Sequence, residues 1–341
     1  MQTPIEYKVK TIKSKHLRLN DLKLEATDSY LYKKYLYKED IPKYPQPEFH
    51  VSHLKHDTHL SGLTGIKTDG GFKYLKNTLR DPCSLPLVWW SLAVGPKDIQ
   101  SAEARLLEKI YPKRTKEQAE KQKSFLYKFA TSPALSSASR YGSYRFTFPL
   151  EDVLSAYSQQ FCSGAPPVMR VFKTSLFRQE VEYAVLVHSP ANQEHFSEYP
   201  FLPDDDLNAV CTYRDGCFIW RSEAMCETHS HELIERPEEN LMTTEAVSWR
   251  PPFYVWDHVV IALHMENEQV LKFDANQLRK NLTFCDKDKV NLPLKLHFNE
   301  FQDAKRHVKN LWPESAPLEK EQSFTANEPE EEPMESEDSQ K

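Results

Sequence analysis

Residues 51–72 read VSHLKHDTHLSGLTGIKTDGGF, a stretch that predicts a strand followed at once by a helix. The short strand at its start is expected to carry His53 and His56 to its C-terminal end. Apolar residues at helical spacing over 60–66 then predict a helix, which Asp69-Gly70-Gly71 ends. At such a junction, histidine rings and free helix amide groups can meet one polar ligand. The stretch therefore predicts a ligand site.

The rest of the chain predicts an α+β fold with a mixed or antiparallel sheet core and flanking helices. Amphipathic spacing predicts helices at 151–161 and 300–311, and a helical region over 98–131 starts at Asp98 and again at Thr115. Arg214-Asp215-Gly216 predicts a hairpin turn. Runs rich in β-branched and aromatic residues predict strands at Leu87–Leu92, Tyr144–Phe148, Val168–Phe172, Val181–Val187, Ala209–Tyr213, Cys217–Trp220, Tyr254–Leu263 and Gln269–Phe273.

The two ends of the chain differ from its centre in composition. Residues 1–45 are rich in lysine and tyrosine and are interpreted as an N-terminal arm, or as a strand-and-helix layer, before a main domain at 46–315. Residues 319–341 carry nine acidic residues and two lysines, with almost no apolar residues. A segment of this kind cannot bury enough apolar surface to fold. We therefore expect 316–341 to be a disordered acidic tail.

Composition excludes several classes of protein. With 8 glycines against 23 prolines, and neither a G-x-G-x-x-G nor a Walker-type motif, the chain lacks the usual glycine-rich phosphate loops. Neither a signal peptide nor an apolar run of membrane-spanning length is present, which predicts a cytoplasmic or nuclear protein without a membrane partner. Its six cysteines are then expected to be reduced thiols.

A pair of acidic residues opens one predicted strand, in FRQEVEYAVLV at 177–187. Because side chains alternate along a strand, Glu180 and Glu182 point to the same face. A carboxylate there can bind a ribose hydroxyl or stabilise an oxocarbenium-like centre, which is the chemistry of breaking a glycosidic bond. The alternative is that both are solvent-facing charges on an edge strand.

Three segments together resemble the ADP-ribosyltransferase superfamily. His53-Leu54-Lys55-His56 and the turn that follows are similar to the opening of the bacterial DNA-targeting ADP-ribosyltransferases. Arg178-Gln179 and 182–187 are similar to the catalytic strand of those enzymes, and Glu180-Val181-Glu182 matches the Glu-x-Glu of arginine-directed transferases. The strand LVWWSL at 87–92 stands between them, and the helices at 98–131 would be an insertion.

The resemblance implies a cofactor and roles for particular residues. It implies NAD as the cofactor and a protein or nucleic acid as the acceptor. His53, with His56 near it, would bind NAD with support from Ser91, and Trp90 or Tyr74 would stack on nicotinamide. Glu182 would act at the ribose and Glu180 would orient the acceptor.

Two other functions remain open on the sequence. The phrases LVWWSLAVGP and YVWDHVVIALH are similar to uncharacterised fish proteins. Some fish-expanded families of this kind are interferon-induced antiviral factors, which suggests a non-catalytic interaction protein of innate immunity. Alternatively, the basic and aromatic residues of the N-terminal arm suggest a nucleic-acid-binding module.

Metal binding is a further alternative, although no metal is expected. The side chains of one 21-residue segment are of the types that bind zinc. They are Cys211, Cys217, Cys226, His229 and His231. The spacing of the first two cysteines is wider than that of usual zinc sites, and buried reduced cysteine is the more common role.

Overall fold

The computed structural model describes residues 9–25, 36–39, 41–74, 85–247, 254–266, 268–287 and 298–313. The predicted acidic tail at 316–341 lies outside these residues, as does part of the predicted N-terminal arm. The described part of that arm forms β1 (Lys10–Lys13) and α1 (Leu19–Glu25), and Leu22 of α1 is fully buried. This part of the arm is therefore a strand-and-helix layer on the main body.

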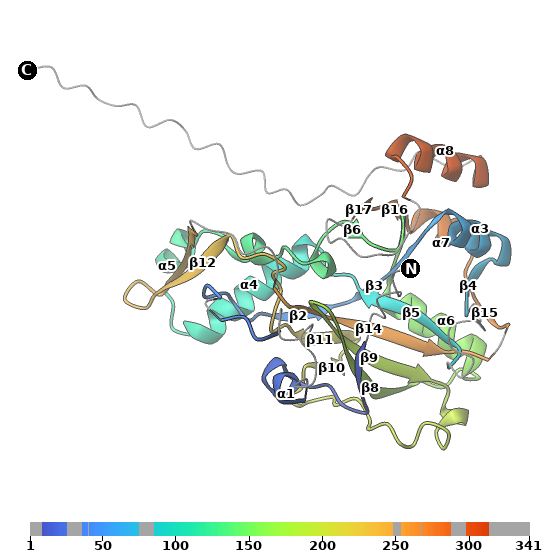
Figure 1. Cartoon of the computed structure of the whole chain (residues 1–341), viewed down its shortest axis with the longest axis horizontal. Helices are drawn as coiled ribbons and strands as arrows, with labels where there is room; N and C mark the ends of the chain where they lie inside the picture. Colours follow the sequence, from blue (N-terminus) through green and yellow to red (C-terminus); the bar gives the residue numbers. More distant parts are fainter. Residues whose placement is uncertain are drawn as a thin grey trace, which may run out of the picture.

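A large mixed sheet forms the centre of the described fold (Figure 1). Its strands hydrogen-bond in the order β1-β8-β9-β14-β5-β3-β7-β16. The pair β9 and β14 is parallel, and the other neighbours are antiparallel. After β1, the bounds are β3 (His53–Thr58), β5 (Leu87–Leu92), β7 (Tyr144–Pro149), β8 (Val168–Phe177), β9 (Glu180–His188), β14 (Trp256–His264) and β16 (Leu282–Phe284). The predicted α+β class with a mixed sheet is confirmed.

The opening stretch folds as a strand and a helix, but with a different boundary. His53 begins β3, so the expectation that it lies at a strand's C-terminal end is wrong. The predicted helix is confirmed as α3 (Leu60–Asp69), and Gly70 ends it in the left-handed conformation. The third histidine of the segment, His59, is the N-cap, because its Nδ1 accepts a hydrogen bond from the Gly62 amide at 3.2 Å.

The other helices lie around the sheet. Figure 1 shows α3, α7 (Ala275–Lys280) and α8 (Phe301–Leu311) gathered at one end of the sheet and α4 (Pro96–Ile110) and α5 (Lys116–Lys121) toward the other. The predicted helix at 151–161 is α6 (Leu150–Phe161). Asp98 accepts a hydrogen bond from the Gly95 amide, so α4 begins before it. None of the described helices has the length and apolar composition required to cross a bilayer.

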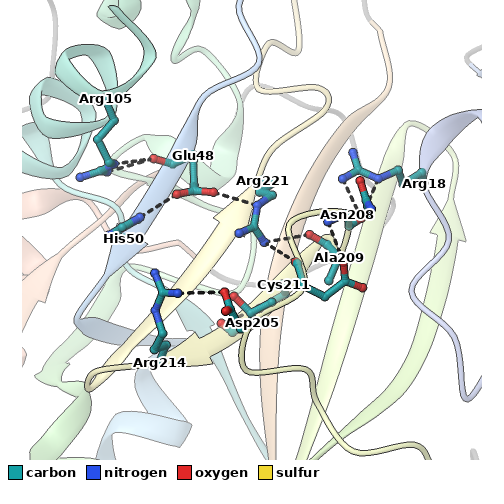
Figure 2. A network of polar contacts seen from close by, with 12 residues as sticks. Arg18, Glu48, His50, Arg105, Asp205, Asn208, Ala209, Cys211, Arg214 and Arg221 are labelled. Carbon is teal, nitrogen blue, oxygen red and sulfur yellow. Dashed lines mark hydrogen bonds and ion pairs between the residues drawn. The ribbon is translucent and has the colours of Figure 1, made fainter. Parts of the chain in front are cut away.

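Smaller sheets complete the described fold. β2 (Glu48–Val51) joins β10 (Cys211–Arg214) and β11 (Cys217–Arg221), and the predicted hairpin turn is confirmed because Asp215 and Gly216 both have positive φ. Figure 2 shows Arg221 and His50 converging on the Glu48 carboxylate. The remaining pairs are β12 (His231–Arg236) with β13 (Leu241–Ala246), β4 (Gly71–Lys73) with β15 (Val270–Lys272), and β6 (Ala138–Ser139) with β17 (Asp286–Lys287).

The two faces of the large sheet bury different surfaces. Along β9, Val181, Tyr183 and Val185 belong to the main hydrophobic core, whereas Ala184 and Leu186 belong to a second, smaller cluster. Alternation along the strand explains this division. Glu180 and Glu182 lie on the same face as Ala184, and that face is therefore apolar at one end and charged at the other.

Candidate functional site

A hollow opens on the charged part of this second face. It contains about 480 Å³ of space free of protein atoms, part of it open to solvent. Ser91 of β5, Glu180 of β9 and His258 of β14 contribute polar side chains, and Trp256 contributes an apolar wall. Residues from four strands of the large sheet, β3, β5, β9 and β14, and from the segment 133–141 thus surround one space.

Glu180 is a buried carboxylate of the hollow that is paired with an arginine. Its side chain is only 6% exposed, and both oxygens accept hydrogen bonds from the Arg140 guanidinium. His258 Nε2 lies 2.7 Å from the Glu180 Oε1 atom. Burial alone would raise the pKa of Glu180, but Arg140 and His258 outweigh burial and lower it to about 2. Glu180 is therefore ionised over the whole physiological range.

Glu182 lies beside His258 in the sheet, and its side chain is less constrained than that of Glu180. Glu182 and His258 are direct partners in the parallel pairing of β9 and β14. The Lys173 Nζ atom lies 4.0 Å from the Glu182 Oε1 atom, and both side chains are 23% exposed. A partly exposed carboxylate without a short ion pair can turn toward a ligand. Of the two glutamates, Glu182 is the one with freedom to act.

The wall of the hollow on β3 is also charged. Arg145 binds Asp57 through two hydrogen bonds, of 2.7 and 2.9 Å, and this pairing outweighs burial to lower the pKa of the Asp57 carboxyl. Lys55 is buried and donates a hydrogen bond to the Ala134 carbonyl at 3.0 Å. The hollow thus carries acidic and basic groups of nearly balanced charge.

One group of side chains could hold a metal ion. Among the described residues, ligand atoms of Glu180, Glu182 and His258 all lie within 4.8 Å of one another. Two carboxylates and an imidazole are suitable ligands for a divalent cation. However, Arg140 occupies both oxygens of Glu180, so a metal ion would have to displace a guanidinium.

The structure brings some of the predicted residues together and separates others. Ser91 and Glu180 line the same hollow, and Glu182 is adjacent. His53 is exposed on β3, with β5 and β14 between it and Glu182. At about 4.8 Å per strand, the two backbones are about 14 Å apart. The structure therefore places two strands between His53 and Glu182, and their joint binding of one nucleotide stays a prediction.

Three other predicted cofactor-binding residues lie away from the hollow. His56 packs on Phe72 and Trp90 with its Nδ1 2.8 Å from the Trp89 carbonyl oxygen. Trp90 is 1% exposed in the main core and cannot stack on a ligand here. Tyr74 follows β4 and packs against the same core. Alternation on β3 and β5 directs His56 and Trp90 to the core face.

The predicted zinc ligands do not assemble. Among described residues, the ligand atoms of Cys211, Cys217, Cys226, His229 and His231 form no group suited to one ion. Cys226 donates a hydrogen bond to the Phe129 carbonyl, and burial raises the pKa of its thiol. His229 lies between the rings of Tyr44 and Tyr254, and burial lowers its pKa to about 4.

Sequence reasoning did not single out His258 or Arg140, which both line the hollow. Asp257 and His258 stand in the predicted strand Tyr254–Leu263 directly before the apolar run VVIAL, and polar residues in such a strand are a signal that could have been used. Arg140 lies in SRYGSY, a loop-like segment with no pattern that distinguishes it. Its contact with Glu180 spans 40 residues and is visible only in the fold.

Comparisons with protein-family models, with curated proteins and with solved structures found no match to this chain. The geometry of the hollow therefore carries the functional argument.

Proposed function

We propose that the protein binds NAD in the hollow and breaks the bond between nicotinamide and ribose, passing ADP-ribose to a protein or nucleic-acid acceptor. The fold would then be a variant of the ADP-ribosyltransferase type, as the sequence resemblance implies. The observation that supports this most is the convergence of Ser91, Glu180 and Glu182 on one space. These residues come from two of the three segments that carry the resemblance.

The chemistry assigns a separate role to each of these residues. NAD would supply the ribose whose bond to nicotinamide breaks, with positive charge developing on the anomeric carbon. Glu182, partly exposed and able to turn, stabilises that charge and binds a ribose hydroxyl. Ser91, half-buried on β5, donates or accepts a hydrogen bond to the same part of the ligand. Trp256 contributes apolar surface to the wall of the hollow beside these residues.

Nicotinamide release from NAD tests this proposal. Purified protein is incubated with labelled NAD, with and without candidate protein and nucleic-acid acceptors. Glu182→Gln should lower the rate by about 100-fold or more, since a charge that acts on the transition state is lost. Glu245→Gln is the matched control, because Glu245 is an exposed strand glutamate on β13. Absence of both nicotinamide release and calorimetric NAD binding would refute the proposal.

A non-catalytic interaction protein is the second candidate function. The observation in its favour is that Arg140 and His258 already contact the Glu180 carboxylate, as in a structural ion pair. In this alternative the hollow recognises a ligand without turning it over, in the innate-immune role that the sequence suggests. NAD binding without nicotinamide release in the wild-type protein would favour this function over the enzyme.

A further inference from the structure

Three polar side chains lie side by side on the face of the sheet that carries the hollow. Lys55 of β3 is the direct cross-strand partner of Ser91 on β5 and of Thr147 on β7. Cross-strand partners point to the same face, and neighbouring strands are about 4.8 Å apart. An ammonium group therefore stands between two hydroxyl groups, and Lys55 and Ser91 both line the hollow.

The hydroxyl groups beside Lys55 are suited to a ligand. Thr147 Oγ1 is buried and has no hydrogen-bond partner among the described residues. Buried polar groups in proteins normally have a partner, so an unmet group of this kind needs an explanation. Ser91 is half-buried at the wall of the hollow. Both hydroxyl groups can donate a hydrogen bond to a ligand oxygen, as can the Lys55 ammonium group.

The charges at the β3 end of the hollow favour an anion. Asp57 is two residues from Lys55 on β3, and Arg145 donates to both of its oxygens. Lys55 is buried, and its ammonium group donates a hydrogen bond to the neutral carbonyl of Ala134. The two cations Lys55 and Arg145 thus stand against the one carboxylate of Asp57, a local balance of +1. Because buried charge is costly unless it is balanced, an anionic ligand is favoured here.

The acidic groups of the hollow lie at its opposite end. Glu180 and Glu182 are on β9, and β5 and β14 separate that strand from β3. At about 4.8 Å per strand, the two strands are about 14 Å apart. A phosphate group carries negative charge and several acceptor oxygens. It therefore matches the donors and the charge of the β3 end, whereas the glutamates of β9 would repel it.

We infer that Lys55, with the hydroxyl groups of Ser91 and Thr147 on either side of it, forms a phosphate subsite at the β3 end of the hollow, for the diphosphate of a nucleotide. The inference rests on the proposed function in treating the hollow as the ligand site, and it adds which end holds the phosphates. Its assay contains no NAD. ADP binding without nicotinamide release would support the subsite alone, and nicotinamide release without ADP binding would support the enzyme alone.

Calorimetry of ADP and adenosine with the full chain is the test. ADP should bind at least 10-fold more tightly than adenosine, because only ADP carries phosphates. Lys55→Met should remove this difference, since it keeps the length of the buried side chain and removes its charge. Ser91→Ala should weaken ADP binding by about 5-fold, the loss of one hydrogen bond. Lys116→Met is the matched control, because the Lys116 side chain on α5 is 91% exposed.

Indole N–H signals follow the same binding in the wild-type protein. Trp220 and Trp256 line the hollow, and their indole nitrogens have no hydrogen-bond partner among the described residues. In ¹⁵N spectra, ADP should shift at least one of the two signals, assigned with Trp220→Phe and Trp256→Phe, and adenosine should shift it less. If Lys55→Met does not fold, Lys55→Gln replaces it.

Three results would overturn the inference. The first is that ADP and adenosine bind equally or not at all. The second is that ADP binding is unchanged when Lys55 loses its charge. The third is that inorganic pyrophosphate binds as tightly as ADP, which would indicate a site for the free anion and not for a nucleotide.

Discussion

The two ends of one sheet face differ in how their strands are covered. At the start of β9 and β14, Glu180 and His258 line an open hollow beside an arginine from a turn. At the end of the same two strands, His188 and His264 lie beneath the segment 189–202. The strands keep a continuous parallel register from Glu180 to Val187. The difference therefore arises from the covering segments and not from the sheet.

The end of the face that lies beneath the segment 189–202 is called the closed end here, and the end with the hollow is called the open end. The closed end contains a buried, neutral histidine. His188 is fully buried, and its Nε2 lies 2.9 Å from Arg170 Nε. Because arginine can only donate, Nε2 is the acceptor and the His188 proton is on Nδ1, 2.7 Å from the Ser189 carbonyl oxygen. Arg170 also donates to the Tyr199 carbonyl at 2.6 Å, which ties the covering segment to β8.

The comparison indicates where a ligand can enter. Phe196 of the covering segment packs against both His188 and His264, at ring separations of 4.9 and 4.8 Å, and fills the closed end with apolar surface. The open end is instead covered by one ion pair from a short turn. Because the hollow at the open end is partly open to solvent whereas the closed end is filled, function is expected at the open end.

Arg140→Met should have the largest effect on stability. It leaves the buried Glu180 carboxylate without its cation, at a cost of about 3–5 kcal/mol in the free energy of unfolding. Arg140→Met/Glu180→Met should regain most of this loss, because the buried charge is removed as well. Urea unfolding of both variants measures the difference. A single variant as stable as wild type would show that the pair is unimportant.

Phe196→Ala tests the closed end. It should lower the free energy of unfolding by about 3 kcal/mol, which is the lower limit for truncating a buried phenylalanine, because the covering segment can partly collapse into the space. Hydrogen exchange should increase within 189–202 and stay unchanged at 139–142. An equal increase in both segments would show that the two ends are not independent.

Mild acid should loosen the closed end before the open one. Burial lowers the pKa of His188 below 6.5, so its contribution to stability is complete above pH 6.5 and is lost as the pH falls toward the lowered value. Protonation places a positive Nε2–H against Arg170, in a cluster that also contains His195, His264 and Glu266. We expect a loss of about 1–2 kcal/mol, comparable to one unmade buried hydrogen bond.

The open end should stay unchanged over this pH range. Glu180 keeps its charge until the pH approaches 2, so its ion pair persists where His188 has already titrated. Proteolysis rates between pH 7.5 and 5 measure the difference, with cleavage rising within 189–202. His188→Gln should remove most of the pH dependence, and a dependence that survives it would contradict this assignment.

Glu182→Gln should change stability least. The Glu182 ion pair with Lys173 is long and partly exposed, so its loss is expected to cost less than about 1 kcal/mol. Thermal melting measures the stability change, and the nicotinamide-release assay is run on the same variant. A small stability change with a large loss of nicotinamide release would show that Glu182 acts on the ligand, whereas a cost above about 2 kcal/mol would indicate a structural role.

The sequence allowed the local parts of the site to be predicted. Alternation in FRQEVEYAVLV placed Glu180 and Glu182 on one face, and the register of β9 with β14 confirms it. Apolar spacing located α3 and the turn that ends it. These features depend on a few neighbouring residues, which is why periodicity reveals them.

The long-range parts could not be predicted in this way. His53 and His56 stand three residues apart, which in a strand directs them to opposite faces, and the error lay in the assumed boundary of the strand. The contact of Arg140 with Glu180 depends on a turn packing onto β3 through Gly142. Neither propensity nor spacing specifies which distant loop covers a given end of a sheet.

Hydrogen exchange with and without saturating NAD tests the central claim most directly, because it examines both ends of the face in one experiment. The account predicts that exchange slows at least 10-fold in peptides that contain Ser91, 139–141 and 180–182, and stays unchanged in 189–202. Unchanged exchange around the hollow, or protection confined to 189–202, would contradict the claim that the charged end of the sheet is the ligand site.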